Sequence, residues 1–307
     1  MRIAVIDLGT NTFNLVIADH NKSYYTIIHQ AKFSVKLGEG GINQNIIQPV
    51  PFWRGVDNIE KMLSIIKEFS VSKIYAFATS AIRDAANGAH FVDAVFKLFK
   101  LKINVITGNK EAQLIYLGVK SALSIGKKNA LIMDIGGGST EFIIANDDEV
   151  FWKRSYKLGA ARLLEKFEGP EPITTESLMA IESYLTDELK TLNKAIKKFK
   201  VHELIGSSGS FDTFAEMICH QFYTADLLEG KTSFEYRIND LIDIHQQLLN
   251  STREQRLKMN GLLAMRVDMI VIASIFSNYI IQKYNIKKVR LSTYSLKEGV
   301  LYKMIQK

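Results

Sequence analysis

The sequence predicts an α/β protein made of two duplicated domains, and three observations lead to this prediction. The chain has 307 residues, which suits two domains of about 100–200 residues each. Residues 3–18, IAVIDLGTNTFNLVIA, align without gaps with residues 130–145, ALIMDIGGGSTEFIIA. Apolar stretches of strand and helix length alternate elsewhere. We expect domains at residues 1–122 and 123–307, with the last helix able to pack back on the first domain.

The repeated stretch has the pattern of a β-hairpin, with an apolar strand, a turn that begins Asp-x-Gly, and a second apolar strand. Asp7 corresponds to Asp134, and Gly9 corresponds to Gly136. Asp and Gly are common in ordinary turns, but two copies at matched positions indicate a function. Small or hydrogen-bonding residues continue both turns, namely Thr10, Asn11 and Thr12 in one copy and Gly137, Gly138, Ser139 and Thr140 in the other.

Both turns have the composition of a phosphate-binding loop. Glycine lets backbone N–H groups approach an anion, and Ser, Thr and Asn side chains add further donors. A carboxylate beside a phosphate would repel it unless a cation lay between them. Mg²⁺ is typically held by one or two carboxylates, waters and phosphate oxygens. We therefore expect Asp7 and Asp134 to hold Mg²⁺, or Mn²⁺ in its place.

The remainder of the first half alternates between helix and strand patterns. Residues 32–45 form a basic, Gly-rich stretch that predicts a loop, and residues 55–69 have apolar side chains at helical spacing. This alternation predicts crossover units on a largely parallel sheet. The elements expected next are a strand at 73–78, a helix at 84–99, a strand at 102–106 and a helix at 111–123.

Two short segments, residues 79–83 and 107–111, follow strands of this sheet, where ligands of α/β proteins bind. Arg83 lies in the first segment, and a guanidinium group suits phosphate well, although it also suits a surface ion pair. Glu111 begins the next helix, where the helix dipole stabilises an acidic residue by about 0.3–1 kcal/mol. The residues alone leave both interpretations of each side chain open.

The second half contains a third turn rich in glycine and serine. Residues 206–210, GSSGS, follow a strand expected at 201–205 and lead into a helix, a place where anions often bind. Such a sequence is also common in plain linkers. The other elements expected here are strands at 149–154 and 287–291 and helices at 160–167, 175–197, 239–249, 264–284 and 296–305.

Composition excludes several classes of function. The net charge of +7 would attract a polyanion, but nucleic acid is disfavoured because no zinc-finger spacing or RNA-recognition motif is present. The scattered histidines lack paired metal-ligand spacing. The single cysteine, Cys219, fits a reducing cytoplasm, and no apolar stretch approaches the roughly 20 residues that span a bilayer. We expect a cytoplasmic protein with no membrane partner.

The motifs DLGTNT, TSAIRDA, ITGNKEA, DIGGGSTE and GSSGS occur in this order over nearly the whole chain. Together they resemble the exopolyphosphatase/guanosine pentaphosphatase (Ppx/GppA) family. KLGEGGI at residues 36–42, KLGAARL at 157–163 and LKEGVLY at 296–302 strengthen the resemblance. It implies two duplicated actin-like (ribonuclease H-like) domains, with substrate phosphates bound in the cleft between them.

The resemblance also implies a reaction, the hydrolysis of the terminal phosphate of inorganic polyphosphate and of guanosine pentaphosphate. By this resemblance Glu111 matches the carboxylate that activates water, and Glu141 matches a second catalytic acid. Asp7 and Asp134 match metal positions. The positions that match phosphate-binding residues are Gly9, Thr10, Asn11, Thr12, Arg83, Gly136, Gly137, Gly138, Ser139, Thr140, Ser208 and Gly209.

The chain departs from the family pattern in three places. Asn14 stands where the family often has Arg or His, and residues 292–295 differ from the usual Ser-Asp and Gly near the last strand. The additional helical domains of longer relatives have no counterpart, so we expect short polyphosphates to be favoured. The alternatives are an actin-like kinase or ATPase, and a non-catalytic sensor of guanosine polyphosphates. The sequence leaves a homodimer open.

Overall fold

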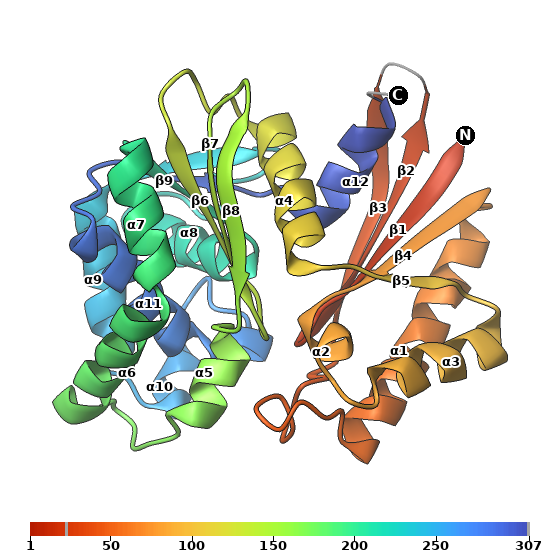
Figure 1. Cartoon of the computed structure of the whole chain (residues 1–307), viewed down its shortest axis with the longest axis horizontal. Helices are drawn as coiled ribbons and strands as arrows, with labels where there is room; N and C mark the ends of the chain where they lie inside the picture. Colours follow the sequence, from red (N-terminus) through yellow and green to blue (C-terminus); the bar gives the residue numbers. More distant parts are fainter. Residues whose placement is uncertain (22–23, 306–307) are drawn as a thin grey trace.

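The structure is a computed structural model that describes residues 1–21 and 24–305. Two lobes stand side by side, each built on a mixed β-sheet with helices packed against it (Figure 1). This arrangement confirms the α/β class predicted above.

The first lobe contains a five-stranded sheet in the order β3-β2-β1-β4-β5. Its centre, β1 (Arg2–Leu8), pairs antiparallel with β2 (Thr12–His20) and parallel with β4 (Lys73–Ala78). The edges are β3 (Tyr25–Ser34) and β5 (Ile103–Val105). The helices of this lobe are α1 (Pro49–Glu68), α2 (Ser80–Arg83) and α3 (Gly88–Phe99).

The second lobe contains a six-stranded sheet in the order β10-β11-β9-β6-β7-β8. Its strands are β6 (Ala130–Ile135), β7 (Thr140–Ala145), β8 (Val150–Tyr156), β9 (Glu203–Ser207), β10 (Ser233–Tyr236) and β11 (Val289–Ser292). Its helices are α5 (Ala160–Lys166), α6 (Thr175–Glu188), α7 (Lys190–Phe199), α8 (Gly209–Phe222), α9 (Ile238–Leu249), α10 (Arg253–Arg256), the 3₁₀ turn η1 (Ala264–Arg266) and α11 (Ile270–Lys283). Helix α11 is buried along most of its length, which explains its almost uniformly apolar sequence.

The two sheets have the same strand order, so the duplication extends well beyond the hairpins that revealed it. Strands β8-β7-β6-β9-β11 correspond to β3-β2-β1-β4-β5, and β10 is an addition at one edge. The actin-like fold implied by the resemblance is confirmed. The expectation of a largely parallel sheet was wrong, because the repeated unit is itself an antiparallel hairpin extended by a third antiparallel strand.

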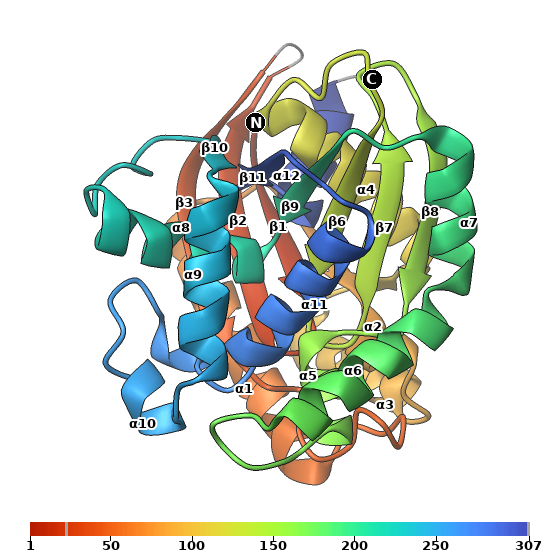
Figure 2. The same ribbon diagram turned by 90° about the vertical axis from the view of Figure 1, so that its left-hand side faces the viewer.

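Helices α4 (Gly108–Ala122) and α12 (Leu296–Ile305) lie between the lobes (Figures 1 and 2). They pack on each other, and α12 also packs against β1, β2 and β3. The crossing is tight, because a Cβ atom at Gly118 would collide with the carbonyl group of Ser295, and one at Gly299 would collide with that of Leu114. The two glycines thus set the distance between these helices.

Some predicted elements differ from those in the structure. The stretch 32–45 begins within β3, an edge strand in which half-buried and exposed side chains alternate, so its last residues belong to a strand and not to a loop. The helix predicted at 175–197 is two helices that meet at Leu189, and nothing in the packing explains this break. The helix predicted at 264–284 begins instead with η1. The domain limit near residue 122 stays a prediction.

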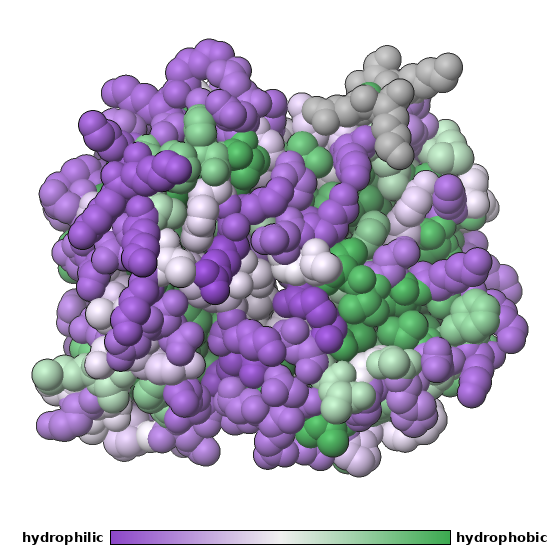
Figure 3. Space-filling view, viewed as in Figure 1, coloured by the Kyte–Doolittle hydropathy of each residue, from purple (hydrophilic) through white to green (hydrophobic). Residues whose placement is uncertain are grey.

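The face of the molecule drawn in Figure 3 is largely hydrophilic, apart from an apolar area over edge strand β5. Val105, in that strand, is 47% exposed. Among the residues the structure describes, no helix combines the length and apolar character needed to cross a bilayer.

Candidate active site

A pocket between the lobes, about 1130 Å³ including solvent at its open side, is lined by both hairpin turns and by the N-terminal ends of α4, α8 and α12. Most of the residues predicted from sequence meet here. Those lining the pocket are Asp7, Gly9, Thr10, Asn11, Thr12, Glu111, Asp134, Gly136, Gly137, Gly138, Ser139, Glu141, Ser208 and Gly209.

Two predicted residues do not line this pocket. Thr140 is fully buried, and its hydroxyl donates to the carbonyl oxygen of Leu158 at 2.8 Å. This contact gives it a structural role in the turn. Arg83 lies behind Glu111 and donates a hydrogen bond to its carboxylate.

The two hairpin turns touch each other. A Cβ atom on Gly138 would lie 2.5 Å from Thr10 Oγ1 and 2.6 Å from Ser80 Oγ, both in the first lobe. Glycine is therefore required where the second turn meets the first. The contact joins the turns that follow β1 and β6, and Asp7 and Asp134, at matched positions near the ends of these strands, line one pocket.

Asp7 and Asp134 are held by different partners. Asp7 Oδ2 accepts a hydrogen bond from Asn14 Nδ2 at 3.1 Å, whereas Asp134 Oδ2 accepts from Ser207 Oγ at 3.1 Å and Ser295 Oγ at 2.5 Å. Burial raises the pKa of both carboxyl groups, that of Asp7 to about 6, and repulsion from Asp134 adds to the rise at Asp7. Lys297 opposes this rise.

This donor set fits a Mg²⁺ ion held partly by substrate. Over residues 1–21 and 24–305, no group of three or more His, Cys, Asp or Glu side chains forms a preassembled metal cage. Mg²⁺ commonly uses only one or two carboxylates and completes its shell with water and phosphate oxygens. A half-buried and a buried carboxylate that repel each other in this pocket suit such a cation, so Asp7 and Asp134 are the residues that would hold it.

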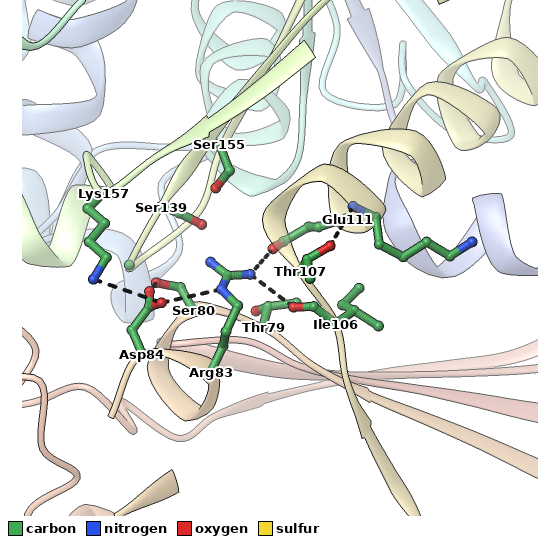
Figure 4. A network of polar contacts seen from close by, with 12 residues as sticks. Thr79, Ser80, Arg83, Asp84, Ile106, Thr107, Glu111, Ser139, Ser155 and Lys157 are labelled. Atoms are coloured by element: carbon green, nitrogen blue, oxygen red, sulfur yellow. Dashed lines mark hydrogen bonds and ion pairs between the residues drawn. The ribbon is translucent and has the colours of Figure 1, made fainter. Parts of the chain in front are cut away.

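Glu111 is placed by its helix and by Arg83. It lies in the first turn of α4, whose N-cap is Thr107, and Arg83 Nη1 donates to Glu111 Oε2 at 2.7 Å. Arg83 also bonds the carbonyl oxygen of Ile106 at 3.3 Å and pairs with Asp84 at 3.4 Å (Figure 4). The guanidinium group is thereby fixed behind the carboxylate of Glu111, a residue that is only 7% exposed.

Glu141 approaches the same place from the second lobe. Its Oε1 accepts hydrogen bonds from Ser139 Oγ at 2.9 Å and Ser155 Oγ at 2.6 Å, and both hydroxyls point toward the Arg83–Glu111 pair in Figure 4. Burial raises the pKa of Glu111 well above its usual range, and repulsion from Glu141 raises it further. Burial also raises the pKa of Glu141, to about 7, and repulsion from Asp134 adds to the rise.

The third predicted loop lies at the start of α8. Ser208 adopts φ 73° and ψ 174°, a conformation that is essentially restricted to glycine and costs about 1–3 kcal/mol. Its side chain interacts with Asp134. The strained turn brings a further hydroxyl group and the first N–H groups of α8 to the pocket.

Sequence reasoning missed four charged residues that line the pocket, namely Lys32, Asp212, Arg266 and Lys297. No motif contains the first three, which lie on an edge strand, a helix first turn and a 3₁₀ turn. The only available signal was Lys297, which lies inside the family-like stretch LKEGVLY.

Comparison with known proteins agrees with this geometry. The model of the Ppx/GppA phosphatase family matches residues 16–307. A crystal structure of an exopolyphosphatase from Cytophaga hutchinsonii is similar over 100% of this chain and 98% of that one, with a TM-score of 0.97 and 37% identity.

Two curated proteins are also similar. A Haemophilus influenzae protein that carries the provisional name exopolyphosphatase is 29% identical over 98% of this chain and 91% of its own length. A Fusobacterium nucleatum protein named bifunctional 3-dehydroquinate synthase/phosphatase is 32% identical over 87% of this chain but only 41% of its own length. Since the family model covers nearly the whole sequence, the chain belongs to the Ppx/GppA phosphatase family of phosphoanhydride hydrolases.

Proposed function

We propose that this protein removes the terminal phosphate from inorganic polyphosphate by attack of a water molecule that Glu111 activates. The observation that carries the proposal is the meeting of both hairpin turns, Glu111 and Glu141 around one pocket. Guanosine pentaphosphate, with similar phosphoanhydride bonds, is the second substrate to test.

Phosphoryl transfer mainly requires positioning of the phosphate, neutralisation of charge and a base that orients the nucleophile. The backbone and hydroxyl groups of the two turns would hold the terminal phosphate, since they supply donors from both lobes. A Mg²⁺ ion held by Asp7 and Asp134 would neutralise charge on the phosphate oxygens.

Glu111 has the properties of a general base. A base works best when its pKa is close to the working pH, and burial together with the neighbouring Glu141 shifts the pKa of Glu111 upward. The bond from Arg83 fixes one carboxylate oxygen, which holds the group in one orientation at the pocket wall. Arg83 thus acts as a positioning residue for Glu111.

The function is tested by measuring phosphate release from tripolyphosphate, longer polyphosphate, guanosine pentaphosphate and ATP in the presence of Mg²⁺ or Mn²⁺. We expect release from polyphosphate. Transfer from ATP to an acceptor with polyphosphate inert would instead show a kinase or ATPase. Tight binding of a guanosine polyphosphate without turnover would show a sensor.

The role of Glu111 is tested by Glu111→Gln, which keeps the shape of the side chain but removes its basicity. We expect kcat to fall by about 10²–10⁴-fold. Glu176→Gln is a matched control, because Glu176 also lies in the first turn of a helix, α6, but on the exposed surface. If Glu111→Gln hydrolyses polyphosphate as fast as wild type while Asp134→Asn does not, the base is another group.

A further inference from the structure

The pocket has a second charged region formed by Lys32, Asp212, Arg266 and Lys297. The four side chains come from β3, α8, η1 and α12, so both lobes contribute. Asp212 interacts electrostatically with all three cations. The region adjoins the two aspartates of the site, since Asp212 acts electrostatically on Asp134.

Asp212 lies among the three cations as an internal counter-ion. Lys32 Nζ lies 3.6 Å from Asp212 Oδ2, an ion pair that joins the two lobes, and the Asp212 side chain is 27% exposed. It can therefore face both the lysine and solvent in the pocket. Ion pairs of this kind contribute little stability when partly hydrated, which makes the pair easy to exchange.

Arg266 is poorly satisfied by the protein itself. Its guanidinium group lies directly over Gly209, at the start of α8, where any Cβ atom would collide with it. Its Nε atom is buried, with no hydrogen-bond partner among the described residues. An unsatisfied buried donor next to a helix N-terminus indicates that an anion completes this region.

Lys297 has its own partner and supplies charge at longer range. Its Nζ atom lies 2.8 Å from Glu298 Oε1, and Glu298 is almost fully buried. Asp212 and Asp7 also interact with Lys297, so it lies between the two regions of the pocket. Asp212 acts more strongly on Lys32 than Glu298 does, and it also acts on Arg266.

We propose that Asp212 is a chain-length selectivity residue that competes with the distal phosphates of a polyphosphate for Lys32 and Arg266. The inference rests on the proposed function, with the reacting phosphate at Glu111. A chain too short to reach the region would not meet Asp212. A longer chain would exchange the carboxylate for its own phosphates, and its binding would be weakened by the negative charge that remains nearby.

Asp212→Asn tests this directly, because it removes the charge and keeps the size of the side chain. We expect KM for polyphosphates of defined length to stay within about twofold of wild type below a threshold length, and to fall by about five- to tenfold above it. The threshold would report how many phosphates separate Asp212 from the reacting phosphorus. An equal change in KM at every length would overturn the proposal.

Lys32→Gln is a second variant, and its expected effect is opposite to that of Asp212→Asn. It should raise KM for the long chains alone. The matched control is Asp268→Asn, which removes a carboxylate from another interlobe ion pair, Lys36–Asp268 at 3.4 Å, outside the pocket lining. No length-dependent change is expected for it. A length-dependent change of similar size in Asp268→Asn would attribute the effect to lobe contact and not to Asp212.

Calorimetric binding separates this inference from the proposed function. Tripolyphosphate and a long polyphosphate are titrated into wild type and Asp212→Asn without divalent metal. Tighter binding of the long chain by the variant would support the role of Asp212. If the wild-type protein bound polyphosphate in this way but did not hydrolyse it, only the proposed function would fail. Unchanged binding of both probes, with a melting temperature like that of wild type, would reject the inference.

Discussion

The two Asp hairpins have the same strand pairing but differ in the residue that lies opposite the aspartate. Asp7 lies opposite Asn14 in the β1–β2 pair, and Asp134 lies opposite Glu141 in the β6–β7 pair. The first hairpin therefore has one carboxylate and an amide that bonds to it. The second has two carboxylates, and its glutamate turns to Ser139 and Ser155 instead.

The difference shows how a duplicated binding element acquires two tasks. Both copies keep the Asp-x-Gly turn, so both can contribute to phosphate and metal binding. Only the second places an additional acid beside Glu111, where it raises the pKa of the proposed base. The two hairpins thus differ in acid content by one side chain, Glu141 in place of Asn14, within 16 aligned residues.

The strongest test of this comparison is Glu141→Gln. We expect plateau kcat to fall by about 10²-fold. The acid limb of the pH–rate profile should also move to lower pH, because loss of a like charge lowers the pKa of Glu111 and the base stays ionised at lower pH. Profiles of kcat for wild type and variant check both effects.

Asn14→Ser is the control from the other hairpin. Asn14 carries no charge and donates a hydrogen bond to Asp7. The acid limb of the pH–rate profile for kcat should therefore keep its midpoint pH, even if KM changes. A limb that moves equally in both variants would contradict the assignment of the asymmetry to Glu141.

A smaller effect is expected on stability from Asp7→Asn. The folded state raises the pKa of Asp7 from near 4 to about 6, so folding binds a proton more tightly and stability decreases as pH rises through this window. At pH 8 without metal or substrate, the neutral variant should be more stable by about 1–3 kcal/mol. Urea unfolding at pH 8 and pH 4 measures this gain, which should disappear at pH 4.

The smallest effect concerns the third loop, which has no counterpart in the hairpins. Ser208→Gly should relieve the backbone strain at φ 73° and increase unfolding free energy by about 1 kcal/mol. Activity should decrease, since a hydroxyl group next to Asp134 is lost. Urea denaturation and kinetics of the same preparation test the expected gain in stability and the expected loss of activity. A loss of stability would show that the conformation is not strained.

Sequence predicted the parts of the molecule that repeat. The gapless match of residues 3–18 with 130–145 located both turns, and the resemblance to the Ppx/GppA family implied the actin-like fold that contains them. Lys32, Asp212 and Arg266 could not be found in this way, because each is an ordinary charged residue in its own segment. They become a group only when three distant segments fold against one pocket.

The glycine contact between α4 and α12 has a consequence for the site. Glu111 lies in the first turn of α4 and Lys297 in the first turn of α12, so the crossing at Gly118 and Gly299 fixes the spacing between the proposed base and a cation of the substrate pocket. A single methyl group added at either glycine would wedge the two helices apart. Turnover would then be lost through a change at an apolar position, which for Gly118 lies about two helical turns along α4 from Glu111.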